Sequence, residues 1–152
     1  MMLTRAFLGA ERIESRSIKN ANNRITVRIE RVFQSKTTFY IHYSVINRTG
    51  RPYRPVLPAV IVGTAVRPAI SLTSLSREQI DQEMVAKLGE LKQRNLVVVR
   101  SEITKVDLAP GESAEGVVAA REQMASSTLV QLNLGPTVGP DGTRQVQATM
   151  VY

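Results

Sequence analysis

TTFYIHYSVINRTGRPY, residues 37–53, is the stretch that decides the fold. Two sets of residues alternate along it, Phe39, Ile41, Tyr43 and Val45 against Tyr40, His42, Ser44 and Ile46. Successive side chains of a strand point to opposite faces, so this pattern predicts a strand with one face in a core. Residues 47–50 (NRTG) then end the strand with residue types that tolerate turn dihedrals.

The segment before this stretch has the same period of two. Ile25, Val27 and Ile29 alternate with polar neighbours from Arg24 onward, and residues 34–36 (QSK) form a turn signal. The two segments therefore predict an antiparallel hairpin. Arg31 falls in the inward register, which predicts either a bulge near Val32 or an exposed strand end.

The middle of the chain predicts irregular strands followed by a helix. Residues 56–72 are apolar on both strand faces from Val60 to Val62, and prolines at positions 52, 55, 58 and 68 favour short, edge-like or irregular strands there. Residues 76–94 have the pattern of a helix, with a capping box of Ser76 and Gln79. The apolar stripe of this helix is Ile80, Met84, Leu88 and Leu91. We expect the helix to cover the outer face of the preceding strands.

Residues 96–152 return to short strands separated by turn signals. The pattern as a whole is mainly β and predicts an antiparallel sandwich of about seven strands with one inserted helix, at about 76–94. A chain of 152 residues is the size of one domain, which we place at 24–152. Residues 1–23 are predicted to be a leader, either a short helix with a linker or a disordered segment.

Three segments together carry a resemblance to a known class of domain. They are YSVINRTGRPY (43–53), LAPGES (108–113) and GVVAA (116–120). Over residues 24–152 this order resembles the immunoglobulin-like domains of bacterial proteins. The resemblance implies a sandwich used for adhesion, docking or assembly in the cell envelope, in secretion machines or in phage particles, usually without catalysis. The predicted helix at 76–94 departs from a plain domain of that type.

Positive charge is concentrated in the first third of the chain. Residues 1–54 hold eleven lysines and arginines against three glutamates, and the net charge of the whole chain is +7. Such asymmetry attracts an acidic protein, an anionic membrane surface or a nucleic acid. The sequence has no apolar run long enough to span a bilayer and no signal-peptide pattern. We therefore expect either a cytoplasmic protein or a periplasmic or extracytoplasmic piece whose export signal is missing.

The residue types do not form a recognisable catalytic or metal motif. There is no cysteine, and His42 is the single histidine, so the usual thiolate and imidazole metal sites are excluded. The glycine-rich segment 135–142 lacks the lysine and the following helix of a phosphate loop. We expect no cofactor, no metal and no enzymatic activity. Asn47-Arg48-Thr49 matches the glycosylation pattern, which we interpret as coincidence.

The candidate binding surface is the outward face of the predicted hairpin. Arg24, Arg28, Tyr40 and His42 lie on it, a mixture of cations and aromatics that occurs both at protein interfaces and on single-strand nucleic-acid platforms. We expect a non-catalytic interaction or assembly module that binds another protein, along an open strand edge or over this face. The alternative is a basic domain that binds nucleic acid or an anionic surface.

Overall fold

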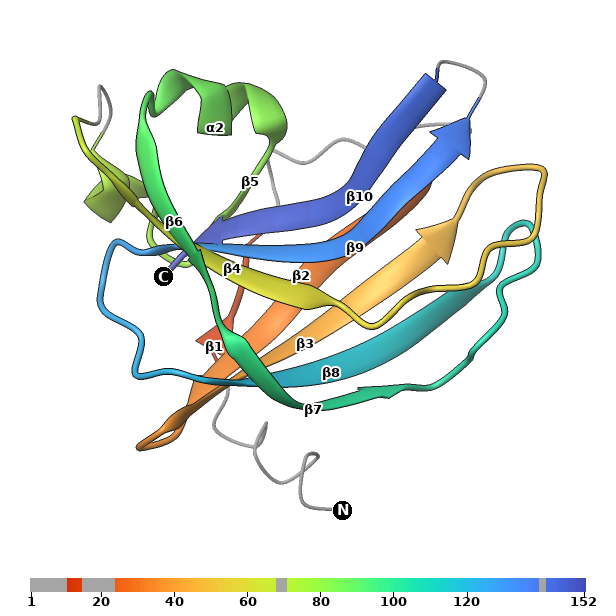
Figure 1. Cartoon of the computed structure of the whole chain (residues 1–152), viewed down its shortest axis with the longest axis horizontal. Coiled ribbons are helices and arrows are strands. Elements are labelled where there is room, and N and C mark those ends of the chain that lie inside the picture. The colour runs from red at the N-terminus through yellow and green to blue at the C-terminus, as the bar shows by residue number, and fades with distance from the viewer. Residues whose placement is uncertain (1–10, 15–23, 68–70, 140–141) are drawn as a thin grey trace.

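Two antiparallel five-stranded sheets packed face to face make up the protein (Figure 1). The computed structural model describes residues 11–14, 24–67, 71–139 and 142–152. Sheet I has the order β1-β2-β3-β8-β7, and sheet II has the order β5-β10-β9-β4-β6. The mainly β, antiparallel sandwich predicted from the sequence is therefore confirmed.

The bounds of the strands follow the alternating segments of the sequence. Sheet I is built from β1 (Glu11–Arg12), β2 (Ile25–Gln34), β3 (Thr38–Asn47), β7 (Val97–Ile103) and β8 (Ser113–Arg121). Sheet II is built from β4 (Ala59–Ala65), β5 (Gln79–Ile80), β6 (Leu91–Asn95), β9 (Leu129–Gly139) and β10 (Gly142–Val151). A 3-10 helix, η1 (Leu72–Leu75), and a short α-helix, α2 (Gln82–Lys87), lie between β4 and β6 in the chain.

The predicted hairpin is present as β2 and β3. Val27 is opposite Val45, and Val32 is opposite Ile41. The pairing shifts between Ile29 and Arg31, so Glu30 is a bulge. The bulge restores the inward register at Val32, which is 1% exposed, and leaves Arg31 exposed. The predicted irregularity near Val32 is therefore present.

The helix is present but shorter than the sequence pattern indicates. Arg77 has a positive φ of 63°, and residues 79–80 pair with β10 as β5. The helix instead begins after Asp81, whose side chain accepts a hydrogen bond from the Met84 N–H at 2.9 Å. It ends before Gly89, which has a φ of 76°. Residues 91–95 then pair with β4 as β6, which a sequence pattern based on local spacing does not detect.

The apolar stripe of the predicted helix nevertheless packs together. Ile80 and Leu88 form a small cluster with Leu129 and Val151 on the outer face of sheet II. The helix therefore covers the β9 and β10 part of that sheet. We expected it to cover residues 56–72, and we expected those residues to be irregular or at an edge. Instead β4 is an interior strand between β9 and β6, since no proline falls within 59–65.

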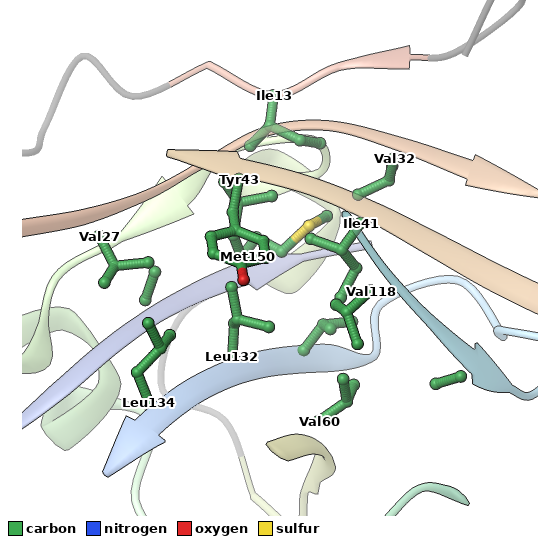
Figure 2. Packing of buried hydrophobic residues seen from close by; sticks show 14 of the residues in the cluster. Ile13, Val27, Val32, Ile41, Tyr43, Val60, Val118, Leu132, Leu134 and Met150 are labelled. Carbon is green, nitrogen blue, oxygen red and sulfur yellow. The ribbon is translucent and has the colours of Figure 1, made fainter. Parts of the chain in front are cut away.

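The main core lies between the two sheets (Figure 2). Sheet I contributes the inward residues of β3, and Tyr43 is among the largest fully buried side chains. Sheet II contributes Leu132, Leu134 and Met150, each at most 1% exposed. Tyr43 is opposite Gly116 on β8, and only a glycine leaves room there for the tyrosine ring.

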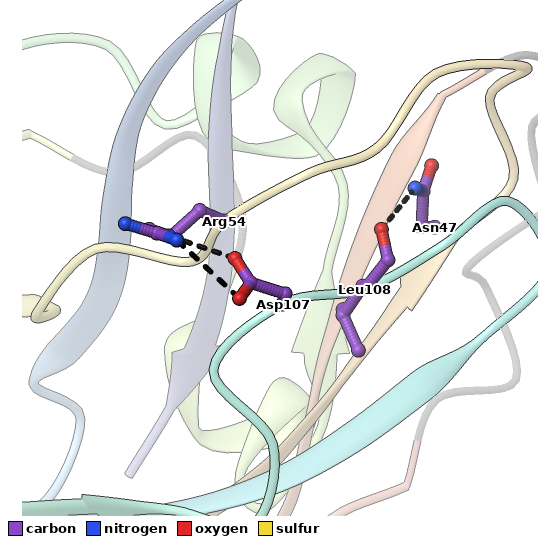
Figure 3. A network of polar contacts seen from close by, with 4 residues as sticks. All are labelled: Asn47, Arg54, Asp107 and Leu108. Carbon is purple, nitrogen blue, oxygen red and sulfur yellow. Dashed lines mark hydrogen bonds and ion pairs between the residues drawn. The ribbon is translucent and has the colours of Figure 1, made fainter.

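A buried asparagine holds one end of the sandwich together (Figure 3). The Asn47 side chain is fully buried and donates to the carbonyl oxygens of Arg51 (2.7 Å) and Leu108 (3.0 Å). Its Oδ1 accepts from the backbone N–H of Thr49 at 3.0 Å and from the Thr49 hydroxyl at 2.6 Å. The amide is fully engaged and Asn47 is buried, so the folded chain does not present the Asn47 nitrogen to a glycan.

A second buried amide closes the outer edge of β2. Gln79 is 2% exposed; its Oε1 accepts from the Ile29 N–H at 2.7 Å, and its Nε2 donates to the Val27 carbonyl at 3.5 Å. The side chain thus takes the place of a neighbouring strand. Next to it, the Gln79 N–H donates to the Glu14 carbonyl at 2.7 Å. Sheet I and sheet II are therefore joined along this side.

We predict that Gly116→Ala lowers the free energy of unfolding by about 1–3 kcal/mol, because overpacking a tight core forces side chains and backbone to move. A Cβ at Gly116 would lie 2.3 Å from Cζ and 2.4 Å from the hydroxyl oxygen of Tyr43. Urea denaturation measures the change. Gly50→Ala is the control, since nothing lies within 4 Å of its added Cβ, and it should change stability by less than about 0.5 kcal/mol. Equal stability of the two variants would contradict this packing.

Asn47→Asp should lower the free energy of unfolding by at least about 2 kcal/mol, because the buried carbonyl of Leu108 and the carbonyl of Arg51 lose their donor and face a buried carboxylate. Asn133→Asp is a matched control. Asn133 uses only its Oδ1, which accepts from the Gly135 N–H at 2.7 Å, and a carboxylate keeps that bond. Urea denaturation at pH 7 should separate the two variants clearly. A control that unfolds as readily as Asn47→Asp would show that the loss is not specific to the buried donor.

Stability should also fall as the pH rises above 10. Burial raises the pKa of Tyr43 to about 12, and the nearby Tyr53 adds to the effect. Between pH 10 and 12 the unfolded chain therefore loses this proton while the folded chain keeps it. Stability is full below pH 10 and decreases by on the order of 2 kcal/mol toward pH 12. Tyr43→Phe should flatten that part of the stability curve, and an unchanged slope in the variant would refute the assignment.

Candidate interaction surface

The β2–β3 hairpin brings three of the four predicted binding residues onto one face. Across the ladder, Arg28 is opposite Ser44, Arg31 is opposite His42, and Phe33 is opposite Tyr40. Residues that are directly opposite share a face, so these side chains form successive rows on the outer side of sheet I. The inward residues of β3 between them are fully buried, which leaves no freedom to reverse the two faces.

Arg24, the fourth predicted residue, lies at the end of the same hairpin. It is exposed and precedes β2, and its carbonyl oxygen accepts a hydrogen bond from the Arg48 N–H at 3.0 Å. It is therefore placed next to the turn that follows β3, one row beyond Thr26 and Ile46.

β8 and β7 extend this face and add charges of both signs to it. Tyr40 is opposite Ala119, which in turn is opposite Arg100. The basic side chains on the face are Arg12, Arg24, Arg28, Arg31, Arg100 and Arg121, and the acidic ones are Glu30, Glu102 and Glu115. β7 and β8 bring as many arginines as glutamates to this surface, so the face keeps the positive excess that the first 54 residues have in the sequence.

Several of these charged side chains interact with a polar or charged neighbour on the same face. Glu30 accepts a hydrogen bond from the Ser44 hydroxyl at 2.8 Å. An Arg100 nitrogen lies 3.0 Å from a Glu102 oxygen. His42 Nε2 lies 3.7 Å from Glu115 Oε1. The face therefore carries charges of both signs with arginines in the majority, which gives an acidic partner both a net attraction and a pattern of charges to match.

An aromatic pair stands at one end of the face. The rings of Phe33 and Tyr40 are 6.0 Å apart between centroids and inclined by 45°. Tyrosine and phenylalanine are enriched at protein interfaces, because each offers a large contact area at a low entropic cost. Both side chains are intermediate in exposure, so part of each ring is accessible.

Glu115 places a carboxylate close to His42, whose side chain is 22% exposed. Among the described residues, no group of three or more histidine, cysteine or acidic side chains could hold a metal ion. A hollow of about 180 Å³ is lined by Glu11, Val32, Phe33, Gln34 and Tyr152, and His42 is not among its lining residues. This volume is below that of a typical small-molecule site.

The described elements leave the outer face of sheet I uncovered. The helix α2 and η1 pack on the opposite side of the molecule, against Leu129 and Val151 of sheet II. Residues 1–10 and 15–23, which hold most of the predicted leader, lie outside the described residues. Within the described chain, no helix has the length and apolar character needed to cross a membrane.

The sequence analysis missed a second accessible feature. Val97 and Val99 on β7 are 67% and 46% exposed, and Val106 just beyond the strand is 61% exposed. The signal is the run LVVVR at 96–100, which is apolar on both faces of a strand. The run predicts a strand, but because it is apolar on both faces it does not indicate which of its valines lie outside the sandwich.

Comparisons with known proteins find solved structures of low similarity, two of which are archaellum proteins. One is the archaellum periplasmic stator protein complex FlaF and FlaG from Sulfolobus acidocaldarius, with 13% identity, a TM-score of 0.40, and coverage of 89% of this chain and 94% of that chain. The other is the archaellum periplasmic stator protein FlaG from Sulfolobus acidocaldarius, with 11% identity, a TM-score of 0.39, and coverage of 84% of this chain and 100% of that chain. No family model and no curated protein matches the chain. The function proposed below rests on this chain's own residues.

Proposed function

We propose that this chain is a non-catalytic, immunoglobulin-like interaction or assembly module that binds another protein over the outer face of sheet I. The observation that carries the proposal is the set of rows on the β2–β3 hairpin, with Arg28, His42 and Tyr40 side by side on one sheet face. A bacterial envelope or secretion complex is the setting that the resemblance of the sequence implies.

The scaffold suits a docking role because its backbone is held on both sides of the hairpin. β3 is paired along its whole length with β2 and β8. Side chains on such strands keep fixed positions, so a partner loses little entropy in ordering them. Tyr40 and Phe33 supply the apolar anchor, and the surrounding charges supply the orientation.

A nucleic-acid partner is disfavoured by the charge pattern. Arginines outnumber glutamates on this face, but Glu30, Glu102 and Glu115 lie among them and weaken its attraction for a run of phosphates. A basic nucleic-acid or anionic-surface binder therefore remains the second candidate, and its affinity should fall steeply with added salt.

The test compares the wild-type chain with a double variant, Arg28→Glu with Tyr40→Ala, as immobilised bait. We expect proteins retained by the wild type to be depleted at least about 10-fold on the double variant, since truncating an interface anchor costs 2 kcal/mol or more. Quantitative mass spectrometry of the retained proteins measures the depletion. Arg94→Glu is the matched control, because Arg94 is exposed on β6 of sheet II, and it should retain the same proteins as the wild type.

Two results would contradict the proposal. One is an identical set of retained proteins on all three baits. The other is tight binding of a single-stranded oligonucleotide that weakens with a steep slope against salt and is lost in the double variant, which would favour the second candidate.

A further inference from the structure

β7 is an open edge of the sandwich. It is the last strand of sheet I and pairs only with β8, and Figure 1 shows no described strand beyond it. The chain enters the strand at Leu96, whose N–H donates to the Val60 carbonyl of sheet II at 2.8 Å. From Val97 onward the free side of β7 makes no backbone hydrogen bond to another described segment.

The other sheet edges are protected in ways that β7 is not. The edge of β2 is closed by Gln79 and by β1. The edge strand β6 carries the exposed cations Lys92 and Arg94, which discourage strand pairing. β7 instead presents Val97 and Val99, which have high strand propensity and are exposed. Its protective features are the bulge between Val98 and Arg100 and the exposed charges of Arg100 and Glu102, which neutralise each other as an ion pair.

The ladder with β8 shows which backbone groups of β7 face the open side. The Thr104 N–H donates to the Glu115 carbonyl at 2.8 Å. In an antiparallel pair the bonded and non-bonded positions alternate, so Glu102 also bonds to β8. Ser101 and Ile103 therefore direct their N–H and C=O groups away from β8, toward the open edge.

We propose that this edge joins a second copy of the chain, with the two β7 strands antiparallel about a two-fold axis at Ser101. Arg100 of each copy then lies opposite Glu102 of the other copy, on the same face. The two residues form an ion pair within one strand at 3.0 Å, so their side chains already lie on that face and can exchange partners without moving far. The contact is isologous, as a closed dimer requires.

The charges select this register over its neighbours. Centring the pair on Arg100 or on Glu102 would place like charges directly opposite each other, which is destabilising. Centring it on Ile103 would leave both charges without an opposite partner. Of these four registers, the one with the axis at Ser101 meets both requirements. The central backbone N–H and C=O groups face the open edge, and Arg100 of each copy lies opposite Glu102 of the other.

The same register covers the exposed valines. Val99 of one copy comes opposite Ile103 of the other, and Val97 comes beside Lys105 and Val106. Val97, Val99 and Val106 are exposed apolar side chains near this edge, and each would bury part of its surface in the contact. The bulge at Val99 lies outside the central positions 100–102.

The test is sedimentation equilibrium of the full chain over a range of concentrations up to about 1 mM, which detects dimers of even weak affinity. We expect a concentration-dependent dimer for the wild type. Arg100→Glu and Glu102→Arg should each weaken the dimer by about 10-fold or more, because each creates two like-charge contacts. An equimolar mixture of the two variants should associate again, since every contact in the mixed dimer pairs unlike charges.

Lys92→Glu is the matched control, because Lys92 is an exposed cation on β6, and it should associate like the wild type. Circular dichroism verifies that each variant is folded. A second measurement needs no variant: the amide protons of Ser101 and Ile103 should exchange more slowly at high than at low protein concentration.

A wild type that stays monomeric at every concentration would overturn the proposal. So would a dimer that is indifferent to both charge reversals, or a mixture of the variants that fails to associate. The result of this test is independent of the test of the proposed function, because Arg28 and Tyr40 are not part of this contact. The double variant Arg28→Glu with Tyr40→Ala should therefore still form the dimer.

Discussion

The burial of one face of β3 is the constraint on which the rest of the structure depends. Phe39, Ile41, Tyr43 and Val45 are each at most 1% exposed between the two sheets. A shift of the strand by one residue would exchange this set for its neighbours, at a cost of several buried side chains. The outer positions are fixed by the same requirement, so Tyr40 and His42 stand on the outside because the core needs the residues between them.

A sandwich must also satisfy or protect the edges of its sheets, and this chain does so differently on its two sides. Near β2 the buried amide of Gln79 substitutes for a strand and connects the sheets. On the other side the chain passes directly from β6 to β7 through Leu96, which changes sheet. The β6 half of that continuous segment is rich in cations, whereas the β7 half is rich in valine. Within 13 residues, the chain therefore passes from an edge strand whose cations discourage strand pairing to one whose exposed valines favour it.

The sequence predicted the strands, turns and bulge that depend on neighbouring residues. It did not predict which strands pair with one another, because that depends on residues far apart in the chain. The hairpin and the irregularity near Val32 follow from a local period of two, and both are present. The pairing of β3 with β8 joins residues more than 65 positions apart, so the sequence did not reveal that Glu115 would lie beside His42. The predicted helix over 76–94 was too long for the same reason. Its apolar stripe was correctly identified, but β4 recruits residues 91–95 into sheet II, and Gly89 allows the chain to turn away from the helix.

The two surfaces are geometrically linked, because β7 belongs to the sheet whose outer face carries the hairpin rows. A two-fold axis at Ser101 that extends sheet I from one copy into the next runs perpendicular to the sheet, so both outer faces point to the same side. A partner with two matching sites, or a repeated assembly, would then meet two copies of the face at once. The second contact forms at a high effective concentration, which strengthens binding without any new kind of interaction. The proposed dimer would in this way present two copies of the face on one side of a continuous sheet, with no change to the sandwich itself.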